Sequence, residues 1–100
     1  MPRLAHNVFF KLHDAAGADA LVAACHKYLT VQPGIVFFAA GKVVAELDRP
    51  VNDRDWHVGL HVVFENKQFH DDYQVDPTHN IFIAENKATW AGVRVFDSYV

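Results

Sequence analysis

The chain has 100 residues, a formal net charge of −3 at pH 7 and a hydrophobic fraction of 51%. A chain of this length buries one core, so tandem domains are excluded and residues 1–100 are expected to form a single domain. Its nine Lys and Arg residues are scattered along the sequence, which excludes the basic patch that nucleic-acid binding requires.

A single cysteine, Cys25, excludes an intrachain disulfide and with it a secreted, disulfide-stabilised scaffold. We expect Cys25 to be a small, buried hydrophobic residue. No apolar run approaches the roughly twenty residues that a membrane span needs, and the pattern of a secretory signal is missing. These observations predict a cytoplasmic protein with no membrane partner.

The first predicted elements are a strand and a helix. Residues 4–13 alternate between two faces, as a half-buried strand does. Residues 17–29 place apolar side chains at helical spacing, with Asp14 or Asp19 available as the N-cap. Pro33 and the glycine after it then end the connection.

Two further strands follow, separated by a polar loop at residues 46–54. Residues 35–45 are apolar at odd and even positions alike, which indicates a strand covered on both faces, with Gly41 as a candidate bulge. Residues 56–64 alternate again, and the second face of this strand is polar enough for a functional site.

The last predicted elements are two consecutive helices and a strand. Residues 65–75 indicate a helix, and Asp76 followed by Pro77 is typical of an N-cap with proline at the first helical position. That pair predicts a further helix through about residue 88, and residues 93–99 predict the closing strand.

The element order β-α-β-β-α-β, with its second helix broken in two, predicts a ferredoxin-like α+β fold: a four-stranded antiparallel sheet with helices on one face. The other sheet face is then uncovered, and its apolar residues favour burial against a second copy of the chain. We therefore expect a homodimer, with Phe9 and either Val36 or Phe38 at the interface.

Five segments together resemble the stress-responsive α/β barrel (Dabb) family over nearly the whole chain. They are His6-x-Val8-x-Phe10, Pro33-Gly34-Ile35, residues 56–64, Tyr73-x-x-Asp76-Pro77-x-His79 and Val95-Phe96-Asp97. The resemblance implies a dimeric α+β barrel with a ligand cleft between sheet and helices.

The active site of a plant polyketide cyclase of that family is similar to four positions here, namely His6, His57, Tyr73 and His79. The resemblance implies that these four residues are catalytic and bind the ligand. Asp76 departs from the pattern, because that cyclase and many relatives have histidine there. The substrate therefore does not follow from the resemblance.

The chemistry of His79 depends on its position near the start of the last helix. The positive end of a helix dipole keeps an imidazole neutral and able to act as a base, whereas the nearby Asp76 carboxylate favours the charged ring. The sequence leaves the sign of the pKa shift open. Alternatively, His79 only completes the helix start, and Tyr73, His6 and His57 are hydrogen-bonding residues of the core.

No metal or cofactor is expected. His57 and His61 share a strand face but lie roughly 13 Å apart at about 3.3 Å per residue, too far to bind one ion. The remaining histidines, His13, His26 and His70, are expected to be solvated. There is no phosphate-binding glycine loop and no nucleophile elbow.

Three functions remain open. The first is a homodimer that binds a small, partly apolar molecule such as a carbonyl compound, with His79 as base and Tyr73 as hydrogen-bond donor in cyclase- or lyase-like chemistry. The second is a non-catalytic stress or interaction protein. The third is a cofactor-free or haem-linked monooxygenase that uses Asn7, Trp56 and His79.

Overall fold

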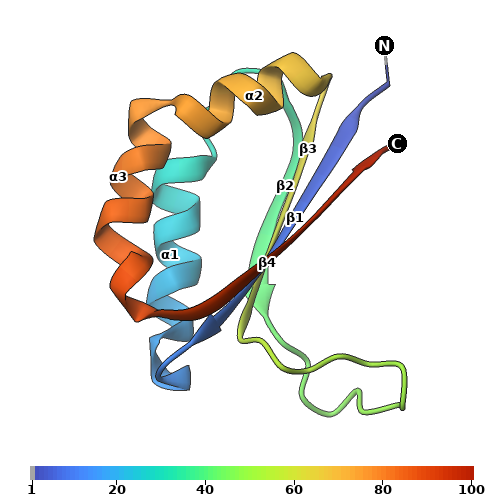
Figure 1. The fold of residues 1–100 in the computed structure, drawn as a ribbon, viewed down its shortest axis with the longest axis vertical. Coiled ribbons are helices and arrows are strands. Elements are labelled where there is room, and N and C mark those ends of the chain that lie inside the picture. The colour runs from blue at the N-terminus through green and yellow to red at the C-terminus, as the bar shows by residue number, and fades with distance from the viewer. Residues whose placement is uncertain (1) are drawn as a thin grey trace.

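A computed structural model describes residues 2–100 of the chain and shows one sheet with three α-helices on one of its faces (Figure 1). All strand pairs are antiparallel, in the order β2-β3-β1-β4. The predicted ferredoxin-like α+β fold is therefore confirmed. Its elements are β1 (Leu4–Leu12), α1 (Ala18–Leu29), β2 (Ile35–Lys42), β3 (Val58–Phe64), α2 (Lys67–Val75), α3 (Pro77–Asn86) and β4 (Trp90–Tyr99).

The core lies between the sheet and the helices, where each element contributes the apolar side chains that its periodicity places on one face. Cys25 is fully buried in α1, as expected, and its burial raises the pKa of the thiol to about 12. The core residues are Leu4, Val8, Phe10, Leu12, Ala18, Leu21, Cys25, Leu29, Val58, Leu60, Val62, Phe64, Tyr73 and Phe82.

The helix starts follow the sequence only in part. The Asp76 side chain accepts a hydrogen bond from the Thr78 N–H at 2.8 Å, and Pro77 is the first residue of α3, as predicted. The predicted cap of α1 is wrong. Asp14 instead accepts the Ala16 N–H of a short 3-10 helix, and Gly17 precedes α1 without a side-chain hydrogen bond.

Strand β2 differs from its prediction in the place of its bulge. The register passes from the pair Ile35–Phe64 to the pair Phe37–Val63, so the extra residue is Val36. Gly41 pairs regularly and is not a bulge. The strand also ends at Lys42, not at residue 45, and β3 begins two residues later than predicted.

This bulge reverses the faces of β2, because one extra residue turns every later side chain to the opposite side of the sheet. Phe38 therefore points to the helices, and its ring lies 5.2 Å from that of His26 in α1. Phe37 points to the other side and is 47% exposed. The expectation that Phe38 belongs to the uncovered face is wrong.

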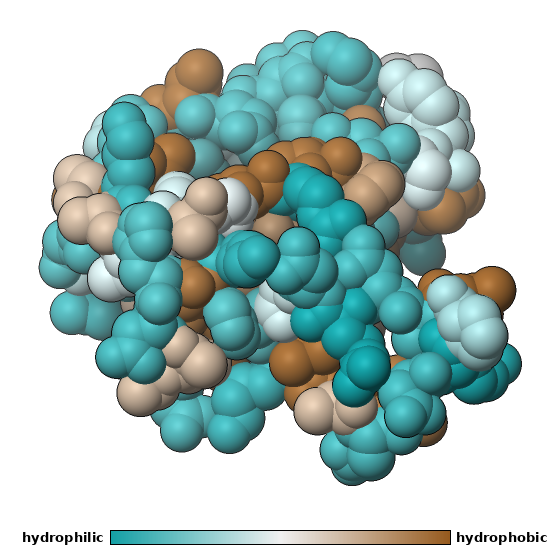
Figure 2. Space-filling view, turned by 60° about the horizontal axis from the view of Figure 1, so that its bottom comes forward, coloured by the Kyte–Doolittle hydropathy of each residue, from teal (hydrophilic) through white to brown (hydrophobic). Residues whose placement is uncertain are grey.

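The sheet side without helices, here called the open face, has an aromatic cluster at its centre. The Phe9 ring lies 4.9 Å from Trp56 and 5.8 Å from both His61 and Phe96, measured between ring centroids. Further apolar side chains are exposed on the β2–β3 loop, among them Val51. Figure 2 shows hydrophobic residues scattered among hydrophilic ones on the surface in that view. Within residues 2–100, no helix is long and apolar enough to cross a membrane.

Candidate functional site

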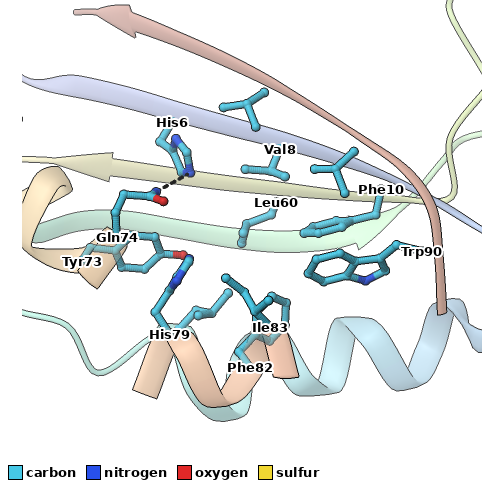
Figure 3. Close-up of a pocket in the computed structure, with 13 residues that line it drawn as sticks. His6, Val8, Phe10, Leu60, Tyr73, Gln74, His79, Phe82, Ile83 and Trp90 are labelled. Carbon is cyan, nitrogen blue, oxygen red and sulfur yellow. Dashed lines mark hydrogen bonds between the residues drawn. The ribbon is translucent and has the colours of Figure 1, made fainter. Parts of the chain in front are cut away.

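A cavity of about 150 Å³ lies between the helix-covered face of the sheet and the helices α2 and α3 (Figure 3). Apolar residues from β1, β3, β4 and α3 form most of its wall, including Val8, Leu60 and Phe82. Three of the four predicted site residues line the same cavity, which brings the start of the chain next to the break between α2 and α3. These three are His6, Tyr73 and His79.

Three hydrogen-bonding groups of residues on this wall are unusual because they are buried without partners. Among residues 2–100, three buried side-chain polar atoms have no hydrogen-bonding partner, and all belong to residues of this cavity. Buried polar groups are nearly always paired, so three such atoms on residues around one cavity favour a polar ligand there. The atoms are Tyr73 Oη, His79 Nδ1 and Trp90 Nε1.

Tyr73 and His79 are held side by side by the break between α2 and α3. Tyr73 lies three residues before the Asp76 cap and His79 three residues after it, so both face the cavity, with ring centroids 4.6 Å apart. Tyr73 is 2% exposed and His79 is 8% exposed. The cap that begins α3 thus positions both functional groups.

The structure resolves the sign that the sequence left open for His79. Burial, reinforced by the neighbouring His6, lowers the pKa of His79 below its ordinary value of 6.5, and the opposing effect of Asp76 is smaller. The imidazole is therefore neutral at pH 7. Burial also raises the pKa of Tyr73, so its hydroxyl keeps its proton and can donate a hydrogen bond.

His6 is oriented by a carboxylate across the sheet. Its Nδ1 lies 2.5 Å from Oδ1 of Asp97, the residue that pairs with it on β4. Since a carboxylate only accepts, Nδ1 donates, and Nε2 is left toward the Gln74 amide at 3.4 Å. Burial lowers the pKa of His6 despite Asp97. The sequence contained Asp97 within a family pattern but gave it no role.

His57 does not join this group. It precedes β3, where its Nδ1 accepts the Leu12 N–H at 2.9 Å and its own N–H donates to the Phe10 carbonyl at 2.8 Å. These bonds connect the start of β3 to the end of β1. The structure thus places His57 outside the cavity, in a position that fits the structural alternative.

The other predicted positions separate into two sides of the sheet. His13 and His26 are exposed, as expected, but His70 is half-buried with its ring centroid 4.9 Å from that of His6. The expectation of a solvated His70 is therefore wrong. Asn7 and Trp56 lie on the open face, opposite the cavity that contains His79, so the three groups proposed for a monooxygenase do not meet within one chain.

A four-stranded antiparallel sheet, helices on one face and a cavity between them define the class of ferredoxin-like α+β proteins. Within that class, the family model for the stress responsive A/B barrel domain matches residues 4–100. The chain belongs to this family.

Solved structures with the same fold include a Dabb family protein from Mesorhizobium loti (TM-score 0.79, 19% identity, 98% of this chain and 96% of that chain covered). A dimeric ferredoxin-like protein from Jannaschia has a TM-score of 0.78 at 24% identity, with 98% and 99% covered. The hydroxynitrile lyase from Passiflora edulis has a TM-score of 0.77 at 15% identity, with 99% and 94% covered. No curated protein matches the sequence.

Proposed function

We propose that this protein binds a small, partly apolar molecule with a carbonyl or hydroxyl group and performs lyase- or cyclase-like acid–base chemistry on it. The observation that supports the proposal is the set of three buried, unpartnered polar atoms that belong to residues of one mainly apolar cavity. Its volume of about 150 Å³ fits a ligand of about one aromatic ring, since an engineered cavity of that volume binds benzene.

Each polar group then has a role. The neutral imidazole of His79 takes a proton from the ligand, and the Tyr73 hydroxyl donates a hydrogen bond to the oxygen on which negative charge develops. His6, held by Asp97, presents Nε2 to the same space. The Passiflora edulis neighbour supports this reading because its name describes a lyase built on the same fold.

We also propose that the active form is a homodimer joined through the open face. An aromatic cluster around Phe9 lies on that face, where the side chains of Phe37 and Phe96 are about half exposed. The Jannaschia neighbour is described as dimeric, which supports a homodimer. A cytoplasmic location is part of this proposal, because a lone buried cysteine needs no oxidising compartment.

The test is a binding and turnover screen with one-ring aldehydes, ketones and cyanohydrins. We expect at least one to raise the melting temperature and to react, with cyanohydrin cleavage giving aldehyde and cyanide. His79→Ala should lower the rate by about 10²- to 10⁴-fold, as loss of a positioned base does. His13→Ala is the matched control, since His13 is exposed and outside the cavity.

Two outcomes would reject the proposal. If no compound of these classes binds, or if His79→Ala reacts as fast as the wild type, the cavity is not an acid–base site. Binding without turnover would favour the alternative of a non-catalytic stress or interaction protein.

The monooxygenase alternative is tested by titrating the protein with haem and following the visible absorption. If the haem spectrum does not change, the haem-linked form of this alternative is rejected.

A further inference from the structure

A second group of polar side chains lies next to the cavity, at the end of the sheet that carries the chain termini. His6, His70 and Asp97 each offer one ligand atom, and these atoms lie within 4.8 Å of one another. The three residues come from β1, α2 and β4, so only the folded chain brings them together. Two imidazoles with one carboxylate form a donor set that binds divalent transition metals.

We propose that His6, His70 and Asp97 form a binding site for a divalent transition-metal ion, with Zn²⁺ as the reference ion. Zn²⁺ accepts nitrogen and oxygen ligands at about 2.0–2.2 Å, and three protein ligands leave its fourth position open. Bonds of that length place neighbouring ligand atoms about 3–4 Å apart. The cluster is therefore within a small side-chain rotation of the required geometry.

The environment of each ligand supports this assignment. Nδ1 of His70 lies 3.0 Å from Oδ1 of Asp71, which fixes the ring and leaves Nε2 free to bind the ion. A carboxylate behind a ligating histidine is a common second layer of metal sites. Binding of the ion through Nδ1 of His6 moves the ring proton to Nε2, and the Gln74 amide beside Nε2 accepts that proton through its oxygen once the amide turns over.

Solvent reaches the cluster from one side. Asp97 has a side chain that is 42% exposed and His70 one that is 16% exposed, and both line a hollow of about 210 Å³. Water in this hollow can fill the open position of the ion. Lys67 also lines the hollow, but its ammonium group is paired with Asp71 at 2.7 Å. The carboxylates of Asp71 and Asp97 therefore outnumber the single ammonium group near the cluster.

This site goes beyond the proposed function and can be tested apart from it. Only His6 belongs to both, because neither His70 nor Asp97 lines the cavity that contains Tyr73 and His79. Substitution at position 70 therefore removes a metal ligand and leaves the wall of the cavity in place, whereas substitution at position 97 also removes the carboxylate that orients His6.

The experiment is calorimetric titration of the full chain with Zn²⁺ after treatment with a chelator and its removal. We expect one ion per chain, with a dissociation constant in the micromolar range or below. His70→Ala and Asp97→Asn should each weaken binding about 10-fold or more, because each removes a ligand. His13→Ala, an exposed histidine outside the cluster, should leave it unchanged.

Co²⁺ supplies a second measurement that does not depend on stability. Its visible d–d bands should appear with the wild type and be lost or shifted in both ligand variants, each checked for folding by circular dichroism. The proposal is overturned if the wild type binds no Zn²⁺ at a concentration of about 100 μM. It is also overturned if His70→Ala and Asp97→Asn bind Zn²⁺ as tightly as the wild type does. His70→Ala should still respond to a cavity ligand, whereas His79→Ala should still bind Zn²⁺, so the two proposals fail separately.

Discussion

The two faces of the sheet show opposite kinds of incompleteness. On the helix-covered face the apolar side chains are buried, whereas polar atoms of Tyr73, His79 and Trp90 have no partner among the described residues. On the open face the polar groups pair with one another, as Asn7 does with His61 at 2.8 Å, whereas aromatic rings remain exposed.

The helix-covered face therefore lacks partners for its polar atoms, and the open face lacks a cover for its aromatic rings. Unpaired polar atoms inside an apolar cavity are stabilised by a small ligand that supplies hydrogen bonds. Exposed rings among satisfied polar groups are stabilised by a second apolar surface, such as the same face of another chain. The comparison assigns ligand binding to one side of the sheet and assembly to the other.

The largest expected effect compares the loss of a buried side chain on the helix-covered face with the loss of an exposed one on the open face. Phe64 is fully buried, so Phe64→Ala should lower the free energy of unfolding by about 3–5 kcal/mol at any protein concentration. Phe37→Ala, on the open face, should lower it only at concentrations where the dimer forms. Urea unfolding at several protein concentrations measures both, and a large loss for Phe37→Ala in dilute monomer would contradict the comparison.

The next effect concerns assembly alone. Phe9→Asp places a charge at the centre of the aromatic cluster and should weaken dimerisation by about 2 kcal/mol or more. Sedimentation velocity measures the change. Val31→Asp is the control, because Val31 is 69% exposed in the connection between α1 and β2. Equal association of the wild type and the Phe9 variant would remove the open face as the interface.

A smaller effect tests how the covered face is positioned. Asp76→Ala removes the cap that accepts the Thr78 N–H and the bond from Gln32 at 3.2 Å, so the melting temperature should fall by about 5 °C. Asp76→Asn keeps an acceptor oxygen and should lose much less. If both variants have the same melting temperature, the cap is not what holds α3 in place.

The pH dependence gives a further test of the buried imidazole. Because the pKa of His79 in the folded chain is lowered below 6.5, the unfolded chain binds more protons in the range between the two values. Its contribution to stability is therefore complete above pH 6.5 and decreases as the pH falls toward the folded pKa. His79→Gln should flatten the decrease in unfolding free energy between pH 7 and pH 5, and an unchanged slope would show that His79 is not buried neutral.

The smallest expected change in stability comes from Tyr73→Phe. The Tyr73 hydroxyl has no partner among residues 2–100, so its removal should leave the melting temperature unchanged or slightly higher. Ligand affinity should nevertheless fall by about 10-fold, because one hydrogen bond to the ligand is lost. Thermal melts with and without a ligand from the screen measure both, and a clear loss of stability would mean that the hydroxyl is bonded within the fold.

The sequence by itself determined the order of elements and the cap that separates α2 from α3. These features depend on neighbouring residues, since alternation, helical spacing and the Asp76-Pro77 pair act over a few positions. For the same reason Tyr73 and His79 could be assigned to one site, as they lie on two sides of a single helix break.

Only the tertiary structure decided which side chains share a face or a cluster. The bulge at Val36 turned Phe38 toward the helices, and nothing near Val36 in the sequence indicates that β2 has an extra residue there relative to β3. His6 and Asp97 lie 91 positions apart and meet because β1 pairs with β4. His57 accepts a hydrogen bond from Leu12 because β3 pairs with β1 on its other side. Such contacts depend on register and burial between distant segments, which local patterns do not contain.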